Sequence, residues 1–125
     1  MKKTALLSCM VIIVGLTITG CEYNKDVVPP PGNTCDTTGI VFSVDIRNIF
    51  DLHGCYSCHT PPAANGGVNL ATHAGVSQVA TDGRLIRALN WTGPVHTRMP
   101  QGGVKLSDCE IARVAAWIRE GQKNN

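Results

Sequence analysis

The chain has 125 residues, a length that suits one small domain, and its 11 basic and 9 acidic residues give a formal net charge of +2. Two of the basic residues, Lys2 and Lys3, precede an apolar run, so the rest of the chain is close to neutral. Nucleic acids and polybasic membrane contacts need clustered Lys and Arg side chains, which the sequence does not provide. We therefore expect no nucleic-acid partner.

The first twenty residues have the pattern of an export signal. After Lys2 and Lys3, residues 5–18 are apolar and uncharged, and this run is shorter than the roughly 20 residues that a spanning helix needs. It ends in Ile-Thr-Gly-Cys, with Cys21 last. This ending resembles the lipobox of bacterial lipoproteins, in which the signal is removed and the cysteine is acylated. An ordinary secretory signal with an unrelated Cys21, or a membrane anchor, is the alternative.

Residues 21–34 are expected to tether a domain to a membrane of the bacterial cell envelope, on the periplasmic side or at the cell surface. A lipid on Cys21 would supply the attachment, and two acyl chains hold stably where one holds marginally. Three successive prolines at 29–31 favour an extended chain. The alternative is an irregular arm packed on the domain. We thus predict a removed signal at 1–20, a tether at 21–34 and a folded domain at 35–125.

Helical periodicity dominates the first half of the folded part. In residues 44–53, the side chains of Ile46, Ile49, Phe50 and His53 recur at the spacing of an amphipathic helix. Residues 69–76 suggest a short helical turn and residues 78–89 a weaker helix. The segment 39–44 is the one short run with the character of a strand. Loops are expected at 60–68 and 90–105.

The last predicted helix has the clearest boundaries. Ser107 followed three residues later by Glu110 forms a capping box, and Gly121 is a plausible end. One apolar stripe follows the cap, with Trp117 beside it: Ile111, Val114, Ala115 and Ile118. These patterns together predict an all-α domain.

The six cysteines divide by position. Cys9 lies in the signal and Cys21 is the lipidation candidate, which leaves Cys35, Cys55, Cys58 and Cys109. Free thiols do not persist in the oxidising compartment that an exported chain meets. If Cys55 and Cys58 act as one unit, Cys35 and Cys109 remain to form a disulfide. Four cysteines allow three pairings, and the sequence leaves the others open.

The sequence CYSCH at 55–59 is the main candidate for a functional motif. A zinc site needs four ligands, usually with a second close pair, and a thioredoxin-like dithiol follows a strand in a βαβ pattern; the flanking sequence shows neither. Two thiols separated by two residues and followed by a histidine are typical of c-type haem attachment. The export signal favours this interpretation, because such attachment takes place outside the cytoplasm.

Met99 is the candidate for a second axial ligand. Outside the signal it is the only methionine, and it lies in a loop rich in Gly and Pro, 40 positions after His59. The alternative is a methionine that fills a gap in a small core. His96 could serve as the sixth ligand instead, although an exposed loop histidine is the simpler interpretation. A Met/His pair raises the reduction potential of haem iron.

With these motifs, the chain resembles the small single-haem class I c-type cytochromes of bacterial envelopes. CYSCH at 55–59, Met-Pro at 99–100 and the helix after KLSDCE carry the resemblance over about residues 40–120. The segments GGVNL and MPQGGVKLSDC are similar to those of lipoprotein cytochromes. The resemblance implies an all-α, cytochrome c-like fold wrapped around one covalent haem c. Cys55 and Cys58 would carry the thioethers, with His59 as the proximal and Met99 as the distal ligand.

The implied function is one-electron transfer to and from redox protein partners, not enzymatic catalysis. The alternative is an open or labile sixth site that binds a gas or peroxide. Pro61 and Pro62 follow the motif so closely that the hydrogen-bond partner of His59 Nδ1 stays open.

Some further side chains have less certain roles. We expect His53 to pack near the haem helix and His73 to lie at the surface. Three arginines are candidates for pairing with haem propionates, although a solvated face is the simpler interpretation of any one of them: Arg84, Arg87 and Arg98. Trp91 could donate its indole N–H to a propionate or belong to the core.

Overall fold

The computed structural model describes residues 34–125, which belong to one unit, Asn33–Asn125. The predicted signal peptide, the lipidation candidate Cys21 and the tether up to residue 33 lie outside the described residues. Residues 34–125 contain helices and no strand, so the prediction of an all-α domain is confirmed for that part. Among these helices, none has the length and apolar character needed to span a bilayer.

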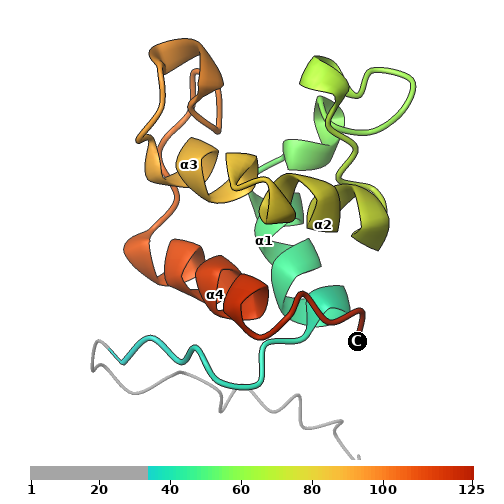
Figure 1. Cartoon of the computed structure of the whole chain (residues 1–125). Helices are drawn as coiled ribbons and strands as arrows, with labels where there is room; N and C mark the ends of the chain where they lie inside the picture. The colour runs from blue at the N-terminus through green and yellow to red at the C-terminus, as the bar shows by residue number, and fades with distance from the viewer. Residues whose placement is uncertain (1–33) are drawn as a thin grey trace, which may run out of the picture. The chain divides into compact units, whose positions relative to one another are not determined.

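The helical elements follow one another in the order that Figure 1 shows. A π-helical turn, η1 (Phe42–Ile46), runs directly into α1 (Arg47–Leu52), and we call residues 42–52 the first helix. Three longer segments follow: α2 (His73–Thr81), α3 (Arg84–Asn90) and α4 (Asp108–Arg119). Single 3-10 turns lie between them: η2 (Cys55–Ser57), η3 (Asn65–Gly67) and η4 (Val95–Thr97).

The first helix agrees with the predicted helix at 44–53 but begins two residues earlier, at Phe42. The Asp45 carboxylate accepts a hydrogen bond from the Val41 N–H at 2.7 Å and so occupies one donor that the helix leaves free at its start. The expectation of strand character at 39–44 is wrong, because the helix takes up the second half of that segment.

The predicted helix at 78–89 is wrong as a single element. It is divided at Asp82 and Gly83, where Gly83 adopts a left-handed conformation with φ of 75°. The Asp82 carboxylate accepts the Arg84 N–H at 2.9 Å, at the start of α3. The short turn expected at 69–76 is the beginning of α2, which Thr72 caps by accepting the Gly75 N–H.

The capping box of α4 is confirmed. Ser107 Oγ accepts the Glu110 N–H at 3.2 Å, and the Glu110 carboxylate accepts the Ser107 N–H at 2.8 Å. The buried face differs from the predicted stripe because Trp117 is at its centre, 1% exposed, whereas Ala115 and Ile118 are half-buried. The residues of α4 that are buried are Ile111, Val114, Ala116 and Trp117.

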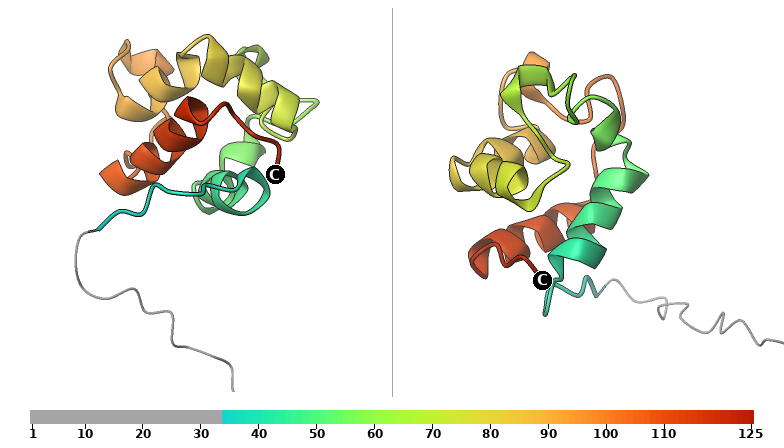
Figure 2. Two further views of the ribbon diagram at one scale, coloured as in Figure 1. Left: turned by 60° about the horizontal axis from the view of Figure 1, so that its bottom comes forward. Right: turned by 90° about the vertical axis from the view of Figure 1, so that its right-hand side faces the viewer.

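The core joins the first helix to α4. Ile46 and Phe50 from the first helix are fully buried with Val114 and Trp117 from α4. The end of the chain covers the start of the first helix, as the right-hand view of Figure 2 shows. There the Asn125 carbonyl accepts the Ser43 N–H at 2.9 Å. Full burial of one large apolar side chain in this core contributes about 1.5–3 kcal/mol to the stability of the fold.

Two further interactions hold α4 to earlier parts of the chain: a disulfide to the segment before the first helix and an ion pair to the first helix. Cys35 and Cys109, which are 74 positions apart in the sequence, form a disulfide with their Cα atoms 5.4 Å apart. A covalent loop of this length contributes about 4 kcal/mol in the chain-entropy model. Arg113 on α4 forms an ion pair with Asp45 on the first helix, at 2.5 Å.

The expectation that His73 is a surface residue is wrong. Its ring packs edge-on against Phe42, with centroids 4.7 Å apart, and against Trp117 at 5.9 Å. Its Nε2 lies 2.7 Å from the Gln122 carbonyl oxygen. His73 therefore fastens the start of α2 to the first helix, to α4 and to the C-terminal segment.

The close approach of α2 to the preceding segment predicts a severe effect of Gly75→Ala. A Cβ at Gly75 would collide with the Asn69 carbonyl oxygen and lie 3.0 Å from its carbon, so backbone must move. We expect a loss of at least about 1–3 kcal/mol in the free energy of unfolding, measured by denaturant titration. Gln78→Ala, at an exposed position of the same helix, is the control and should change it by less than about 0.5 kcal/mol. Equal stability of the two variants would contradict the close approach.

Candidate functional site

The candidate ligands lie in two connections at one end of the domain. Residues 55–59, the CYSCH turn, follow the first helix, and residues 91–106, the methionine loop, join α3 to α4. Figure 1 shows the methionine loop and the segment that follows the CYSCH turn extending beyond α2 and α3, on the side away from α4. Cys55, Cys58 and His59 therefore share one turn, and Met99 lies in the other connection.

Gly54 starts the CYSCH turn. It has φ of 64°, a left-handed conformation that glycine adopts without strain, and it redirects the chain at the end of α1. The Cys58 and His59 N–H groups both donate to the Cys55 carbonyl, at 3.4 and 3.0 Å. This single helical turn brings the two cysteines and the histidine together in space.

Cys55 and Cys58 have free thiols. Cys55 is half-buried, and desolvation by burial raises the pKa of its thiol. Dithiol oxidoreductases need the opposite, a lowered thiol pKa that supplies the attacking thiolate. The environment of Cys55 therefore speaks against a thioredoxin-like function of this pair.

His59 is held by the backbone on both sides of the turn. The Leu70 N–H donates to the His59 carbonyl at 2.8 Å, and the Asn65 N–H donates to the Cys58 carbonyl at 2.9 Å. The His59 Nδ1 atom is buried and has no hydrogen-bond partner, so neither Pro61 nor Pro62 supplies one. The second ring nitrogen, Nε2, is not enclosed in this way and is the one left for a ligand.

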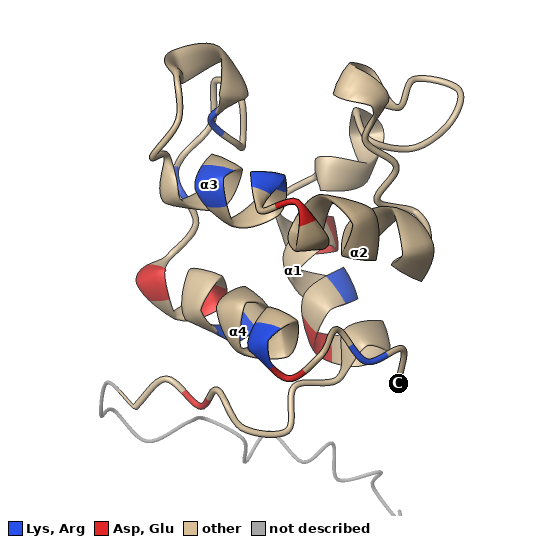
Figure 3. Ribbon diagram, in the orientation of Figure 1, with Lys and Arg blue, Asp and Glu red and all other residues tan. Residues whose placement is uncertain are grey.

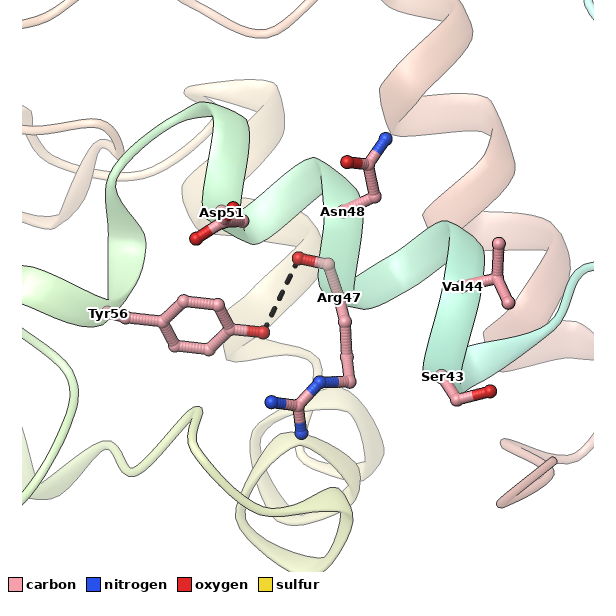
Figure 4. A pocket seen from close by; sticks show the side chains of 6 residues that line it. All are labelled: Ser43, Val44, Arg47, Asn48, Asp51 and Tyr56. Carbon is pink, nitrogen blue, oxygen red and sulfur yellow. Dashed lines mark hydrogen bonds between the residues drawn. The ribbon is translucent and has the colours of Figure 1, made fainter. Parts of the chain in front are cut away.

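Tyr56 anchors the turn to the first helix, a role that the sequence analysis did not identify. Its ring stands edge-on to Phe50 with centroids 6.4 Å apart, and the Arg47 guanidinium lies 5.8 Å from its centroid. Its hydroxyl donates to the Arg47 carbonyl at 3.4 Å (Figure 4). The same side chains border a surface hollow of about 590 Å³, lined by Ser43, Val44, Arg47, Asn48, Asp51 and Tyr56.

His53 links the CYSCH turn to α4. It is the residue that follows the first helix, as its C-cap, and its Nε2 lies 2.8 Å from Glu110 Oε1. Glu110 is the capping-box residue of α4, so one carboxylate serves both elements. The sequence placed His53 near the helix before the motif and did not predict this contact with α4.

Met99 is half-buried, and both of its backbone groups are bound. Its N–H donates to the Ala88 carbonyl in α3 at 3.1 Å, and its carbonyl accepts the Trp91 indole N–H at 2.7 Å. Trp91 therefore neither points its indole at free solvent nor belongs to the fully buried core. His96, three residues before Met99, is exposed, in agreement with the simpler interpretation.

The three candidate arginines differ in what they contact. Arg84 pairs with the Asp82 carboxylate at 2.7 Å, and Arg87 reaches the Asp82 carbonyl at 3.5 Å. Arg98 is half-buried in the methionine loop, where its Nε donates to the Gly93 carbonyl at 3.2 Å. It borders a hollow of about 250 Å³ with Trp91, Val95, Pro100, Gly102 and Gly103. Arg98 is thus the one of the three that lies beside Met99.

The two connections that hold the candidate ligands make up what we call the site end of the domain. This end has almost no charged residues. Residues 52–81 include no Lys, Arg, Asp or Glu, and residues 90–104 include Arg98 alone. Figure 3 shows the charged residues on the helices and near the C-terminus instead. Within residues 34–125, no three or more His, Cys, Asp or Glu side chains gather into a group that could hold a metal ion. This part of the chain therefore provides no four-ligand zinc site.

No protein-family model, curated protein or solved structure matches this chain. Its resemblance to class I c-type cytochromes therefore rests on the residues of the CYSCH turn and the methionine loop.

The contacts of Glu110 predict a loss of stability in acid. Desolvation raises the pKa of this carboxyl, but the hydrogen bonds from Ser107 and His53 outweigh it and leave the pKa below its ordinary value of 4.5. A pKa that folding lowers stabilises the folded state above the unfolded-state pKa. This contribution disappears as the pH falls through the folded-state pKa. We expect Glu110→Gln to reduce the fall in the free energy of unfolding below pH 4.5, measured by denaturant titration.

The matched control is Glu120→Gln, which removes a carboxylate from the other end of α4. It should keep the acid-dependent loss of the wild-type protein. If Glu110→Gln and Glu120→Gln have the same pH dependence, the contacts of Glu110 do not carry the effect.

Proposed function

We propose that this protein is a c-type cytochrome that transfers one electron at a time. Its haem is bonded to Cys55 and Cys58 and ligated by His59 and Met99. The observation that carries the proposal is the state of the four described cysteines. Cys35 and Cys109 are joined, whereas Cys55 and Cys58 are free, one turn apart and directly before His59. In an oxidising compartment two free thiols so close together do not persist, and thioethers to a porphyrin would bond both of them.

The surroundings of His59 fit a proximal ligand. The backbone bonds at Leu70 and Asn65 fix the turn on which the imidazole stands. The Nδ1 atom is buried and has no partner, which leaves Nε2 as the nitrogen that could bind iron. Metal-binding histidines usually donate the other N–H to a partner that makes the ring a stronger donor. Nδ1 of His59 is buried and so is placed for such a partner, although no side chain or carbonyl supplies one in this structure.

The surroundings of Met99 fit a distal ligand. Its backbone is bound at N–H and carbonyl, which leaves the thioether as the free part of the residue. The haem supplies a one-electron iron couple, whose potential Met/His ligation raises. With Met99 bound, the sixth position would be closed to water and gases, and the protein would act as an electron carrier.

The nearly uncharged site end suits a redox protein partner that docks without strong electrostatic steering. Charge complementarity mainly raises association rates, and such steering weakens with salt. The lipidation proposed for Cys21 would hold the protein on an envelope membrane. The partner would then be met by diffusion along or near that membrane.

Met99→Ala tests the distal ligand. We expect the purified mature protein to keep its haem, to lose the weak sulfur-to-ferric-iron absorption band, to bind carbon monoxide when reduced and to have a lower reduction potential. His96→Ala is the control and should leave all four properties unchanged. If His96→Ala changes them and Met99→Ala does not, the distal ligand is His96. A wild-type protein that already binds carbon monoxide would favour the gas-sensing or peroxidase function.

Cys58→Ala tests the attachment. Removal of one thiol leaves a single thioether, so the haem would no longer be bonded to both ends of the turn. We expect the variant to lose stable haem when it is expressed in cells that attach c-type haem. Ser57→Ala, the neighbouring exposed position, should retain it. The measurement is haem absorbance of the protein after denaturing gel separation. Equal haem content in both variants would contradict attachment at Cys58.

A further inference from the structure

Trp91 has an unusual backbone conformation directly after α3. Its φ of 59° and ψ of 29° are left-handed, a conformation that glycine or asparagine usually takes after a helix. For a bulky side chain this conformation costs about 1–2 kcal/mol. Such strain persists where the surrounding structure determines it, and it often marks a functional position. Trp91 thus occupies a backbone position that glycine would adopt with less strain.

The Trp91 side chain is part of a closed set of hydrogen bonds around Met99. The Trp91 and Met99 N–H groups both donate to the Ala88 carbonyl, at 3.3 and 3.1 Å. The Trp91 indole donates to the Met99 carbonyl at 2.7 Å. The left-handed turn at Trp91 brings its indole back over the residue eight positions later.

The hydrogen bonds of Met99 attach residues 93–103, the interior of the methionine loop, to the rest of the domain. Other hydrogen bonds of residues 93–103 stay within the loop, such as those from Thr97 to Pro94 and from Gly103 to Pro100. The bonds of Met99 reach the end of α3 instead. Without the indole, the Met99 carbonyl would have to find another donor, and residues 93–103 would keep only the bond from Met99 to Ala88.

We propose that Trp91 is a positioning residue that holds Met99 on the iron and sets how firmly the sixth site is closed. This inference rests on the proposed haem ligation. It states that the Trp91 indole controls how strongly Met99 stays bound. A typical net hydrogen-bond contribution of about 1 kcal/mol corresponds to a change of about five-fold in an equilibrium. Loss of the indole N–H should therefore raise the population without bound Met99 about five-fold.

The test is Trp91→Phe, which keeps an aromatic ring and removes the donor. We expect the reduced variant to bind carbon monoxide about five-fold more tightly than the wild-type protein, and its sulfur-to-iron band to weaken. The matched control is Trp117→Phe. It removes a similar bond, from the Trp117 indole to the Lys123 carbonyl at 2.9 Å, at the fully buried end of the core. Trp117→Phe should lower the thermal midpoint and leave the band and the carbon monoxide affinity unchanged.

A second measurement uses the wild-type protein and so does not depend on the folding of a variant. Cyanide added to the ferric protein displaces Met99, and hydrogen exchange of the two indole N–H groups is followed by NMR. Because coupling is reciprocal, displacement of Met99 should speed exchange at Trp91 and not at Trp117.

The outcomes distinguish the role of Trp91 from the ligation of haem by Met99. Unchanged carbon monoxide affinity in Trp91→Phe, or unchanged exchange at Trp91 with cyanide, would overturn the role of Trp91 and leave the haem ligation intact. Equal effects of Trp91→Phe and Trp117→Phe would also overturn it, since general destabilisation would then explain both. Absence of the sulfur-to-iron band in the wild-type protein would overturn Met99 ligation itself, and with it this inference.

Discussion

The packing of the first helix against α4 is the interaction on which the rest of the described structure depends. Three kinds of contact hold this pair: the shared core around Phe50 and Trp117, the Asp45–Arg113 ion pair and the Cys35–Cys109 disulfide at the ends. The His53–Glu110 contact extends the pairing to the residue before the CYSCH turn. The direction in which that turn leaves the core is therefore fixed by the same contacts that stabilise the fold.

The two connections at the site end are built differently. The CYSCH turn is short, closed on itself by the Cys55 carbonyl and anchored through Tyr56. The methionine loop is long and depends on α3, through Ala88 and Trp91, for its attachment. This difference suits the proposed roles, because the covalent and proximal bonds need one fixed turn, whereas the distal ligand needs a loop that spans a porphyrin. It also makes the distal side the more adjustable one.

Local patterns predicted those parts of the fold that local interactions determine. The Ser107–Glu110 capping box and the periodicity around Ile46 and Phe50 both appear as expected. The break at Asp82–Gly83 was missed although Asp-Gly is itself a turn signal, because the apolar residues on either side suggested one continuous helix. His73 was misplaced because its partners, Phe42 and Trp117, come from distant segments. The Trp91–Met99 bond has no sequence signal, since it depends on a left-handed Trp91.

The central claim is that Cys55 and Cys58 carry haem, and mass spectrometry of the intact mature protein tests it most directly. The protein should be produced in cells that attach c-type haem and measured after denaturation. The account predicts the mass of the chain plus one haem, located by digestion to the peptide that contains residues 55–59. A chain without added haem, with Cys55 and Cys58 as free thiols or joined to each other, would contradict it.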